Sequence, residues 1–354
     1  HQKPVQSTGF FFARSPMPTP INRSIRPLLL ALLLLAAHAP LSGQPPAALL
    51  RQGVELGVIH DYEPALDLFG RLSTEYPGRP EGPFYRAAIH QSMMLDFESD
   101  EWQELFYADL EEAIHRALQQ LRLQPEDAEA RFYAGAAYAY KSAQLSRDGK
   151  YWPAYRAIQS SLDYLEPLLK EDSTWCDALL GVGTYQYWRS RITIKLSWLP
   201  FFPDRRREGI AMITRAAACA QLSPASAWSN LAWISIREKE YDRAIVWSRT
   251  GLERYPGSRF FLWPIAEAQF LKGDYSAAIG SYSNLLLSTR EAPYNNGYNE
   301  LVILWKMAQC HERIGENDLA RSYYQEMVDC RVAEEVRGRA ESKIRMAREW
   351  LAAH

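Results

Sequence analysis

A short motif occurs twice in the C-terminal half of this 354-residue chain, with a spacing of thirty-four residues. Tyr241-Asp-Arg-Ala244 is followed by Tyr275-Ser-Ala-Ala278, so the tyrosine and the last alanine both recur after the same interval. A period between about 20 and 50 residues is typical of chains built from stacked copies of one supersecondary unit. The interval therefore predicts one continuous repeat domain rather than several separate globular domains.

Other segments share a pattern in which an alanine precedes an aromatic residue by four positions. They are Ala65–Phe69, Ala278–Tyr282 and Ala320–Tyr324. Small residues let two helices approach each other closely, and large rings fill the gaps that remain between them. Prolines such as Pro256 follow the second helix of a unit because proline cannot continue a helix. The pattern predicts helical hairpins.

Two of the intervals are longer than the basic period. The distance from Ala278 to Ala320 is 42 residues, and the extra residues fit the stretch 288–297, which is rich in helix breakers. The N-terminal unit carries a second insertion near Asp96–Glu101.

The combined pattern resembles the tetratricopeptide repeat (TPR) family. Trp228-x2-Leu231-Ala232, Ala244 and Pro256 follow the family motif within one unit. The resemblance implies an all-α fold, a right-handed α-α superhelical solenoid of about seven helix pairs with a C-terminal capping helix. We expect the pairs at 47–80, 81–125, 126–172, 173–224, 225–256, 257–290 and 297–330, with the capping helix at 331–351. Pro167 is expected to kink or end its helix.

The N-terminal segment differs in character from the repeats. Arg23 and Arg26 precede ten apolar residues and then small residues, which is the order of a secretory signal peptide. The apolar run is too short to span a bilayer, which needs roughly 20 residues. We therefore divide the chain into an upstream segment 1–16, a signal peptide 17–43 and a solenoid 44–354. Cleavage after Ala39 or after Gly43 is open, and the second is preferred.

Several function classes are disfavoured by composition and motifs. A net charge of −2 offers no general attraction for nucleic acid. G-x-S-x-G, G-x4-G-K-[ST] and H-E-x-x-H do not occur, so we expect no enzyme activity and no cofactor, although an unrecognised catalytic site is a weaker alternative. The four cysteines lack metal-ligand spacing. Cys219 is expected to be a small core residue, and a Cys310–Cys330 disulfide is not favoured.

The family resemblance places the first helix of each repeat along a concave groove. The groove positions of the three best-matched repeats are Trp233, Trp263, Glu267, Phe270, Trp305 and Gln309. The Lys/Asn/Arg set by which some family members hold a terminal carboxylate is absent there. These residues predict an aromatic groove that binds a protein or an extended peptide, unless the rings are buried between neighbouring repeats. With the signal peptide, this indicates an exported scaffold, periplasmic or secreted, in the bacterial envelope.

A second candidate surface is the long connection between two helices at 187–204. It is apolar and aromatic, which is unusual for a loop, and basic residues follow it. The segment either folds back over the solenoid or docks on a membrane surface or partner. The docking residues would be Trp188, Trp198, Phe201, Phe202, Arg205, Arg206 and Arg207. The alternative function is therefore a membrane-surface adaptor with peripheral membrane contact.

Overall fold

The computed structural model describes residue 43, residues 45–196 and residues 203–354. Within these residues the chain is entirely helical, and the helices follow one another in pairs. The pairs are α1 (Ala47–Val58) with α2 (Tyr62–Glu75), α3 (Glu81–Asp96) with α4 (Gln103–Leu123), α5 (Ala128–Arg147) with α6 (Tyr151–Glu171), α7 (Cys176–Ile192) with α8 (Arg206–Cys219), α9 (Pro224–Arg237) with α10 (Tyr241–Arg254), α11 (Arg259–Lys272) with α12 (Tyr275–Arg290), and α13 (Tyr298–Arg313) with α14 (Asn317–Asp329). A short 3-10 helix, η1 (Ile194–Leu196), follows α7, and α15 (Glu334–Ala353) closes the C-terminal end.

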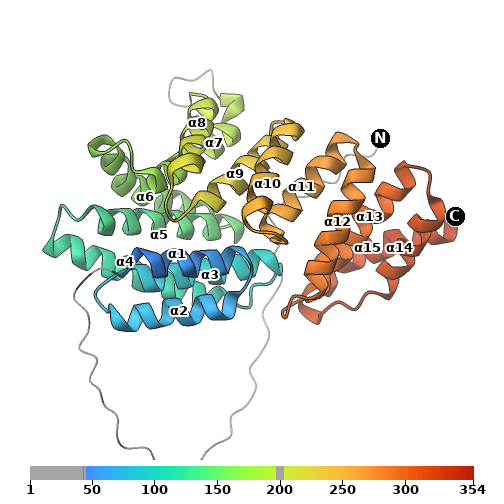
Figure 1. The fold of residues 1–354 in the computed structure, drawn as a ribbon, viewed down its shortest axis with the longest axis horizontal. Helices are drawn as coiled ribbons and strands as arrows, with labels where there is room; N and C mark the ends of the chain where they lie inside the picture. The colour runs from blue at the N-terminus through green and yellow to red at the C-terminus, as the bar shows by residue number, and fades with distance from the viewer. Residues whose placement is uncertain (1–42, 44, 197–202) are drawn as a thin grey trace, which may run out of the picture.

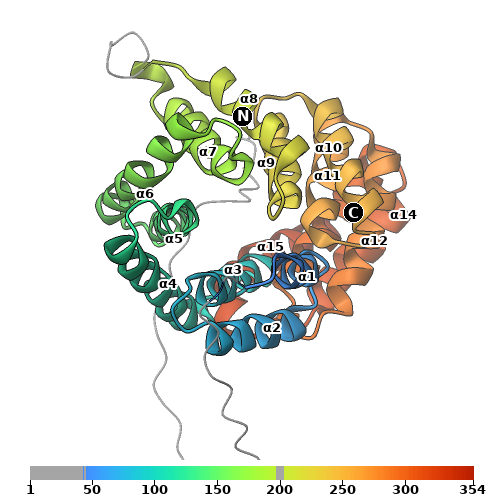
Figure 2. The same cartoon turned by 60° about the vertical axis from the view of Figure 1, so that its left-hand side comes forward.

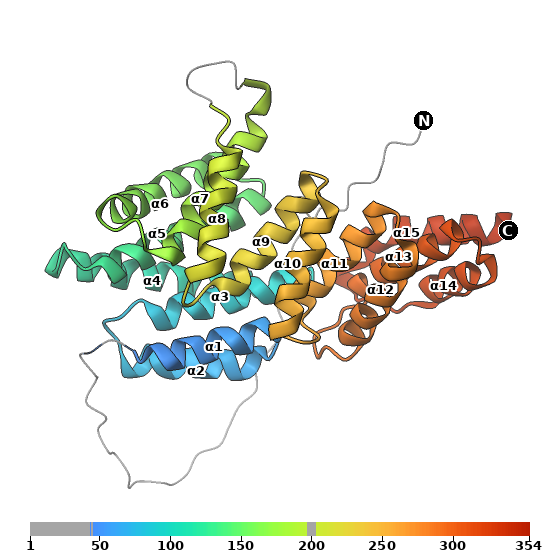
Figure 3. The same cartoon turned by 45° about the horizontal axis from the view of Figure 1, so that its top comes forward.

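The predicted solenoid is confirmed, because successive pairs stack side by side along the chain (Figures 1 and 3). The alanine–aromatic pattern has the packing role expected of it. Ala65, Ala278 and Ala320 are fully buried. Gly53 shows how tight the crossings are, since a Cβ atom there would lie 2.3 Å from the ring of Phe69. A larger residue at this position would force α1 and α2 apart.

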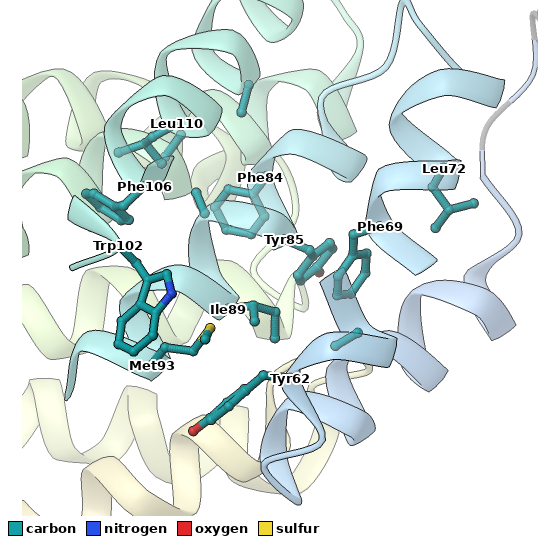
Figure 4. Packing of buried hydrophobic residues seen from close by; sticks show 14 of the residues in the cluster. Tyr62, Phe69, Leu72, Phe84, Tyr85, Ile89, Met93, Trp102, Phe106 and Leu110 are labelled. Carbon is teal, nitrogen blue, oxygen red and sulfur yellow. The ribbon is translucent and has the colours of Figure 1, made fainter. Parts of the chain in front are cut away.

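The core of the first repeats is strongly aromatic (Figure 4). Phe69 of α2 stacks on Tyr85 of α3, with ring centroids 5.0 Å apart. Phe84 contacts both Tyr85 and Tyr133 edge to face, and so joins α3 to α5. Rings in these arrangements add to the stabilisation that burial alone provides. The core therefore runs continuously from one repeat to the next.

Some local expectations were wrong. Helix α6 continues through Pro167 to Glu171, so of the two outcomes expected of this proline, a kink or an end of the helix, the end does not occur. Proline removes one backbone donor, and the packing of α6 on α5 holds the helix together without that bond. Helix α7 extends to Ile192, so residues 187–192 are helical and the connection to α8 is confined to 193–205. Helix α12 likewise extends to Arg290, into the stretch assigned to a loop.

The solenoid curls until its first repeats meet its later ones (Figure 2). Ser258 Oγ, before α11, donates to the carbonyl of Val58 at 2.7 Å. Asn296 Nδ2, before α13, donates to the carbonyl of Phe97 at 2.7 Å. Asn299 Nδ2 reaches the carbonyl of Asp96. We call these contacts between the N-terminal and C-terminal repeats the closure seam.

A buried charge network lies at the centre of the closure seam. Arg259 Nε donates to Asp96 Oδ1 at 2.9 Å, and both side chains are less than a tenth exposed. Tyr62 donates its hydroxyl proton to Asp96 Oδ2 at 3.0 Å. His60 accepts the backbone N–H of Arg259 at Nε2, so its Nδ1 bears the proton and faces Asp96 at 3.2 Å. The carboxylate of Asp96 is thus surrounded by donors.

The pKa of Asp96 reflects this setting. Burial alone would raise it, but His60 and Arg259 outweigh burial and hold the pKa well below its usual range. The ionised Asp96 therefore stabilises the fold above the ordinary carboxyl pKa, and this stabilisation is lost as pH falls toward the lowered folded-state value.

A substitution at Arg259 tests the importance of the closure seam. Arg259→Met leaves the charge of Asp96 buried without its main partner, which is expected to cost about 3–5 kcal/mol of unfolding free energy. Thermal unfolding should occur at a clearly lower temperature, and small-angle scattering should report a larger radius of gyration. Arg254→Met is the control, because Arg254 pairs with Glu55 across the same seam but is 63% exposed. Equal effects of the two substitutions would contradict a central role for the buried pair.

A disulfide joins Cys176 at the start of α7 to Cys219 at the end of α8, with their Cα atoms 5.7 Å apart. The expectation that Cys219 is a core residue was wrong, since it lies on the exposed side of α8. Cys310 and Cys330 are free. Helices α7 and α8 cross closely, since a Cβ atom on Gly209 of α8 would lie only 2.6 Å from the carbonyl oxygen of Gly183 of α7. The bridge clamps the ends of α7 and α8 opposite the 193–205 connection.

Removing the bridge should destabilise the chain. The cysteines are 43 residues apart, and closing a loop of this size in the unfolded chain is worth up to about 4 kcal/mol in the chain-entropy account. Cys219→Ser should therefore lower the unfolding temperature, whereas Cys330→Ser, which removes a free thiol, should change it little. Thiol titration of the oxidised, unfolded chain should find two free thiols. Four thiols would contradict the bridge.

Candidate functional site

The six predicted groove residues lie on three first helices that are neighbours in space. Trp233 is on α9, residues 263–270 are on α11, and Trp305 and Gln309 are on α13. Trp233 packs beside Ile265 of the next repeat. Trp263 and Phe270 pack at the edge of the core that α11, α12 and α13 share. The structure thus brings the predicted aromatic residues onto adjacent helices.

Their exposure is not uniform. Trp233, Trp263, Phe270 and Gln309 are half-buried, so each keeps some accessible surface. Trp305 is only 8% exposed, against the expectation of an open groove position. Its ring is covered by α15, where Lys343 Nζ lies 5.6 Å from the ring centroid.

Glu267 is also buried, at 5% exposure, and it is engaged with its neighbours. Lys306 Nζ of α13 lies 2.8 Å from Glu267 Oε2, and Tyr282 of α12 donates its hydroxyl proton to the same oxygen at 3.0 Å. Burial raises the pKa of Tyr282, and the nearby Glu267 adds to this rise. Lys306 Nζ also lies 4.1 Å from the ring centroid of Phe270. Glu267 therefore joins three helices, and removing one charge of its pair would leave the other buried.

The residues proposed for the docking insert separate into four groups. Trp188 is a helical residue of α7, half-buried beside Tyr187 and the α7–α8 core, so it is not part of a loop. Arg206 is paired with Asp204 at 2.9 Å and with Glu238 at 3.1 Å. Arg205 and Arg207 are exposed at the start of α8. Trp198, Phe201 and Phe202 lie outside the residues that the structure describes.

A surface pocket that the motif search did not find lies between α6 and α7. It has a volume of 470 Å³ and is lined by Tyr155, Gln159, Leu162, Asp163, Glu166, Pro167, Lys170, Tyr185 and Arg189. Trp152 stacks on Tyr155 at its edge, and the two side chains are 68% and 51% exposed. In the sequence, this pocket is indicated by Trp152 and Tyr155, two aromatic residues three positions apart on a polar helix face.

Two searches for other kinds of site gave negative results. Among residues 43, 45–196 and 203–354, no three or more His, Cys, Asp or Glu side chains gather as metal ligands would. Across the same residues, no helix combines the length and the apolar character that crossing a membrane requires.

Stacked helical hairpins with small residues at their crossings and a polar-backed last helix define an α-helical repeat scaffold. A family model described as the tetratricopeptide repeat matches residues 303–329, which include most of α13 and all of α14. This part of the chain is thus similar to a tetratricopeptide repeat, and the stacked hairpins before it have the solenoid form expected from that resemblance.

Solved structures of similar form are distant in sequence. One is PilW, described as a widely conserved type IV pilus biogenesis factor, with 13% identity and a TM-score of 0.46 over 73% of this chain and 97% of that one. Another is the C-terminal part of a TPR repeat-containing protein from Cytophaga hutchinsonii, with 17% identity and a TM-score of 0.38 over 83% and 99%. A third is a tetratricopeptide repeat protein from Parabacteroides merdae, with 11% identity and a TM-score of 0.37 over 85% and 97%.

These likenesses carry no argument about what the chain binds. No curated protein matches the sequence.

Proposed function

We propose that this chain is an exported, non-catalytic scaffold that binds a protein or an extended peptide in the groove along α9, α11 and α13. The observation that carries the proposal is the set of half-buried rings Trp233, Trp263 and Phe270 on adjacent first helices. Aromatic side chains that keep an accessible face are frequent energetic anchors of binding surfaces. Assembly of envelope proteins is the setting that we propose for this binding.

Two features support export. The segment 17–43 has the order of a signal peptide, although all of it except Gly43 lies outside the described residues. The Cys176–Cys219 disulfide is the second feature, because such bridges form and persist in oxidising compartments.

Affinity capture from an envelope extract tests the groove. The bait is the chain from Gln44 onward, with captured proteins identified by mass. Replacing both Trp233 and Trp263 by Ala should reduce capture, since each anchoring ring is worth about 2 kcal/mol of binding. The control replaces the exposed stack of Trp152 and Tyr155 by Ala, which removes comparable aromatic surface away from the groove.

The two double variants must be compared at equal helicity and unfolding temperature. Loss of capture by the groove variant alone supports the proposal. Equal loss in both would show that exposed rings bind non-specifically, and unchanged capture by the groove variant would exclude the groove. The single variant Trp305→Ala should instead unfold at a lower temperature, because its ring is buried.

One observation favours the alternative role as a membrane-surface adaptor. Ile192, the last residue of α7, is 77% exposed immediately before the 193–205 connection, and Arg205 and Arg207 are exposed at the other end of that connection. An apolar residue beside basic side chains suits the surface of an anionic membrane. Sedimentation with anionic vesicles, lost on replacing Arg205 and Arg207 by Gln, would favour this role over the groove.

A further inference from the structure

Lys343 of α15 occupies an unusual position for a lysine. Its side chain is half-buried over α13, and its Nζ lies 5.6 Å from the ring centroids of both Tyr298 and Trp305. No carboxylate of the described chain lies within ion-pair distance of it. The faces of Tyr298 and Trp305 stabilise the ammonium group of Lys343 only partly. In a desolvated site, each cation–ring contact contributes less free energy than a well-formed ion pair.

The surroundings of Lys343 disfavour its charge. Burial lowers the pKa of its ammonium group, and the neighbouring positive charges of Arg339 and Lys306 lower it further, while Glu98 opposes them. A methionine at position 343 would cover the ring of Trp305 equally well, and it would avoid the free-energy cost of burying a charge. The chain thus keeps a charge here that its own fold does not require.

The charges around Lys343 do not balance. Lys306 is matched by Glu267 at 2.8 Å, and Arg339 is matched by Glu98 at 3.1 Å. Among the described residues, Glu267 and Glu98 are thus each paired with a cation other than Lys343. Lys343 is the third cation of the cluster, so the cluster lacks one negative charge.

We propose that this cluster, made of Lys306, Arg339, Lys343, Tyr298 and Trp305, binds an acidic side chain of the partner peptide. A carboxylate would accept a charge-assisted hydrogen bond from Lys343 Nζ and so complete the charge balance. The inference rests on the proposed function, and it specifies the chemistry of the peptide at one position.

The cluster is continuous with the groove. Trp305 and Lys306 belong to α13, and Lys306 lies against Phe270 of α11. A peptide that follows the groove from Trp263 toward the C-terminal repeats would therefore reach Lys343 next.

A peptide fits this cluster better than a nucleic acid. A nucleic acid carries a phosphate at every residue and requires several unpaired cations. Here a single cation is unmatched, on a chain with a net charge of −2. One carboxylate is the complement of one ammonium group.

Paired peptides provide the test. Each pair consists of a short peptide with one Glu between aromatic or aliphatic residues and a twin with Gln in its place. Both ends are blocked, so that no terminal carboxylate contributes. Binding to the chain from Gln44 onward is measured by fluorescence anisotropy. We expect the Glu peptides that bind to do so about tenfold more tightly than their twins, as a charge-assisted hydrogen bond would give.

Lys343→Met should abolish this preference and leave the weaker, shared binding in place. Its unfolding temperature should be unchanged or higher, so loss of folding would not explain the result. Arg345→Met is the matched control, because it removes the same charge from the exposed side of the same helix and should keep the preference.

The remaining outcomes separate this inference from the groove itself. Peptides that bind without any preference for Glu, or a preference that survives in Lys343→Met, would overturn the inference but leave the groove intact. Competition by inorganic phosphate equal to that by the Glu peptide would also overturn it, since any anion would then suffice. Absence of binding by every peptide would overturn both proposals.

Discussion

The contact between Asp96 and Arg259 joins residues that are 163 positions apart, and the form of the molecule depends on it. In an open solenoid each repeat contacts mainly the repeats beside it. Here the end of α3 and the loop after it also contact α11, α13 and α15, through Asp96, Phe97 and Glu98. The curl of the solenoid brings these groups together, and the buried charge network holds them there. The proposed groove and the proposed Lys343 cluster both lie on the C-terminal repeats that this contact joins to the first ones.

Most of the fold could be predicted from the sequence because repeat hairpins are determined locally. Ala65 and Phe69, or Ala278 and Tyr282, lie on one helix face and decide how two consecutive helices cross. The period then extends the same arrangement along the chain, and the seven expected pairs are present among the described residues. The misplaced boundaries were those of α7 and α12, which extend to Ile192 and Arg290, into segments that were expected to be loops.

The closure seam and the details of the site could not be predicted in this way. In the sequence, Asp96 and Arg259 have the appearance of ordinary surface charges, because their burial depends on the curvature accumulated over the three helix pairs between them, from α5 to α10. Cys176 and Cys219 show no short spacing, and only the crossing of α7 and α8 brings them together. Trp305 occupies a groove position in its own repeat, but a lysine of α15 covers its ring. Each of these features depends on residues distant in the sequence.

The contacts of the closure seam also change the order in which the repeats unfold. The terminal repeats of a linear array have one neighbour instead of two, so they fray first, and loss of structure spreads inward from the ends. The first repeat here is tied to the fifth by Arg254, which pairs with Glu55, and to the sixth by Ser258 and Arg259. We therefore expect the backbone amides of α2 to exchange with solvent about as slowly as those of the central helices.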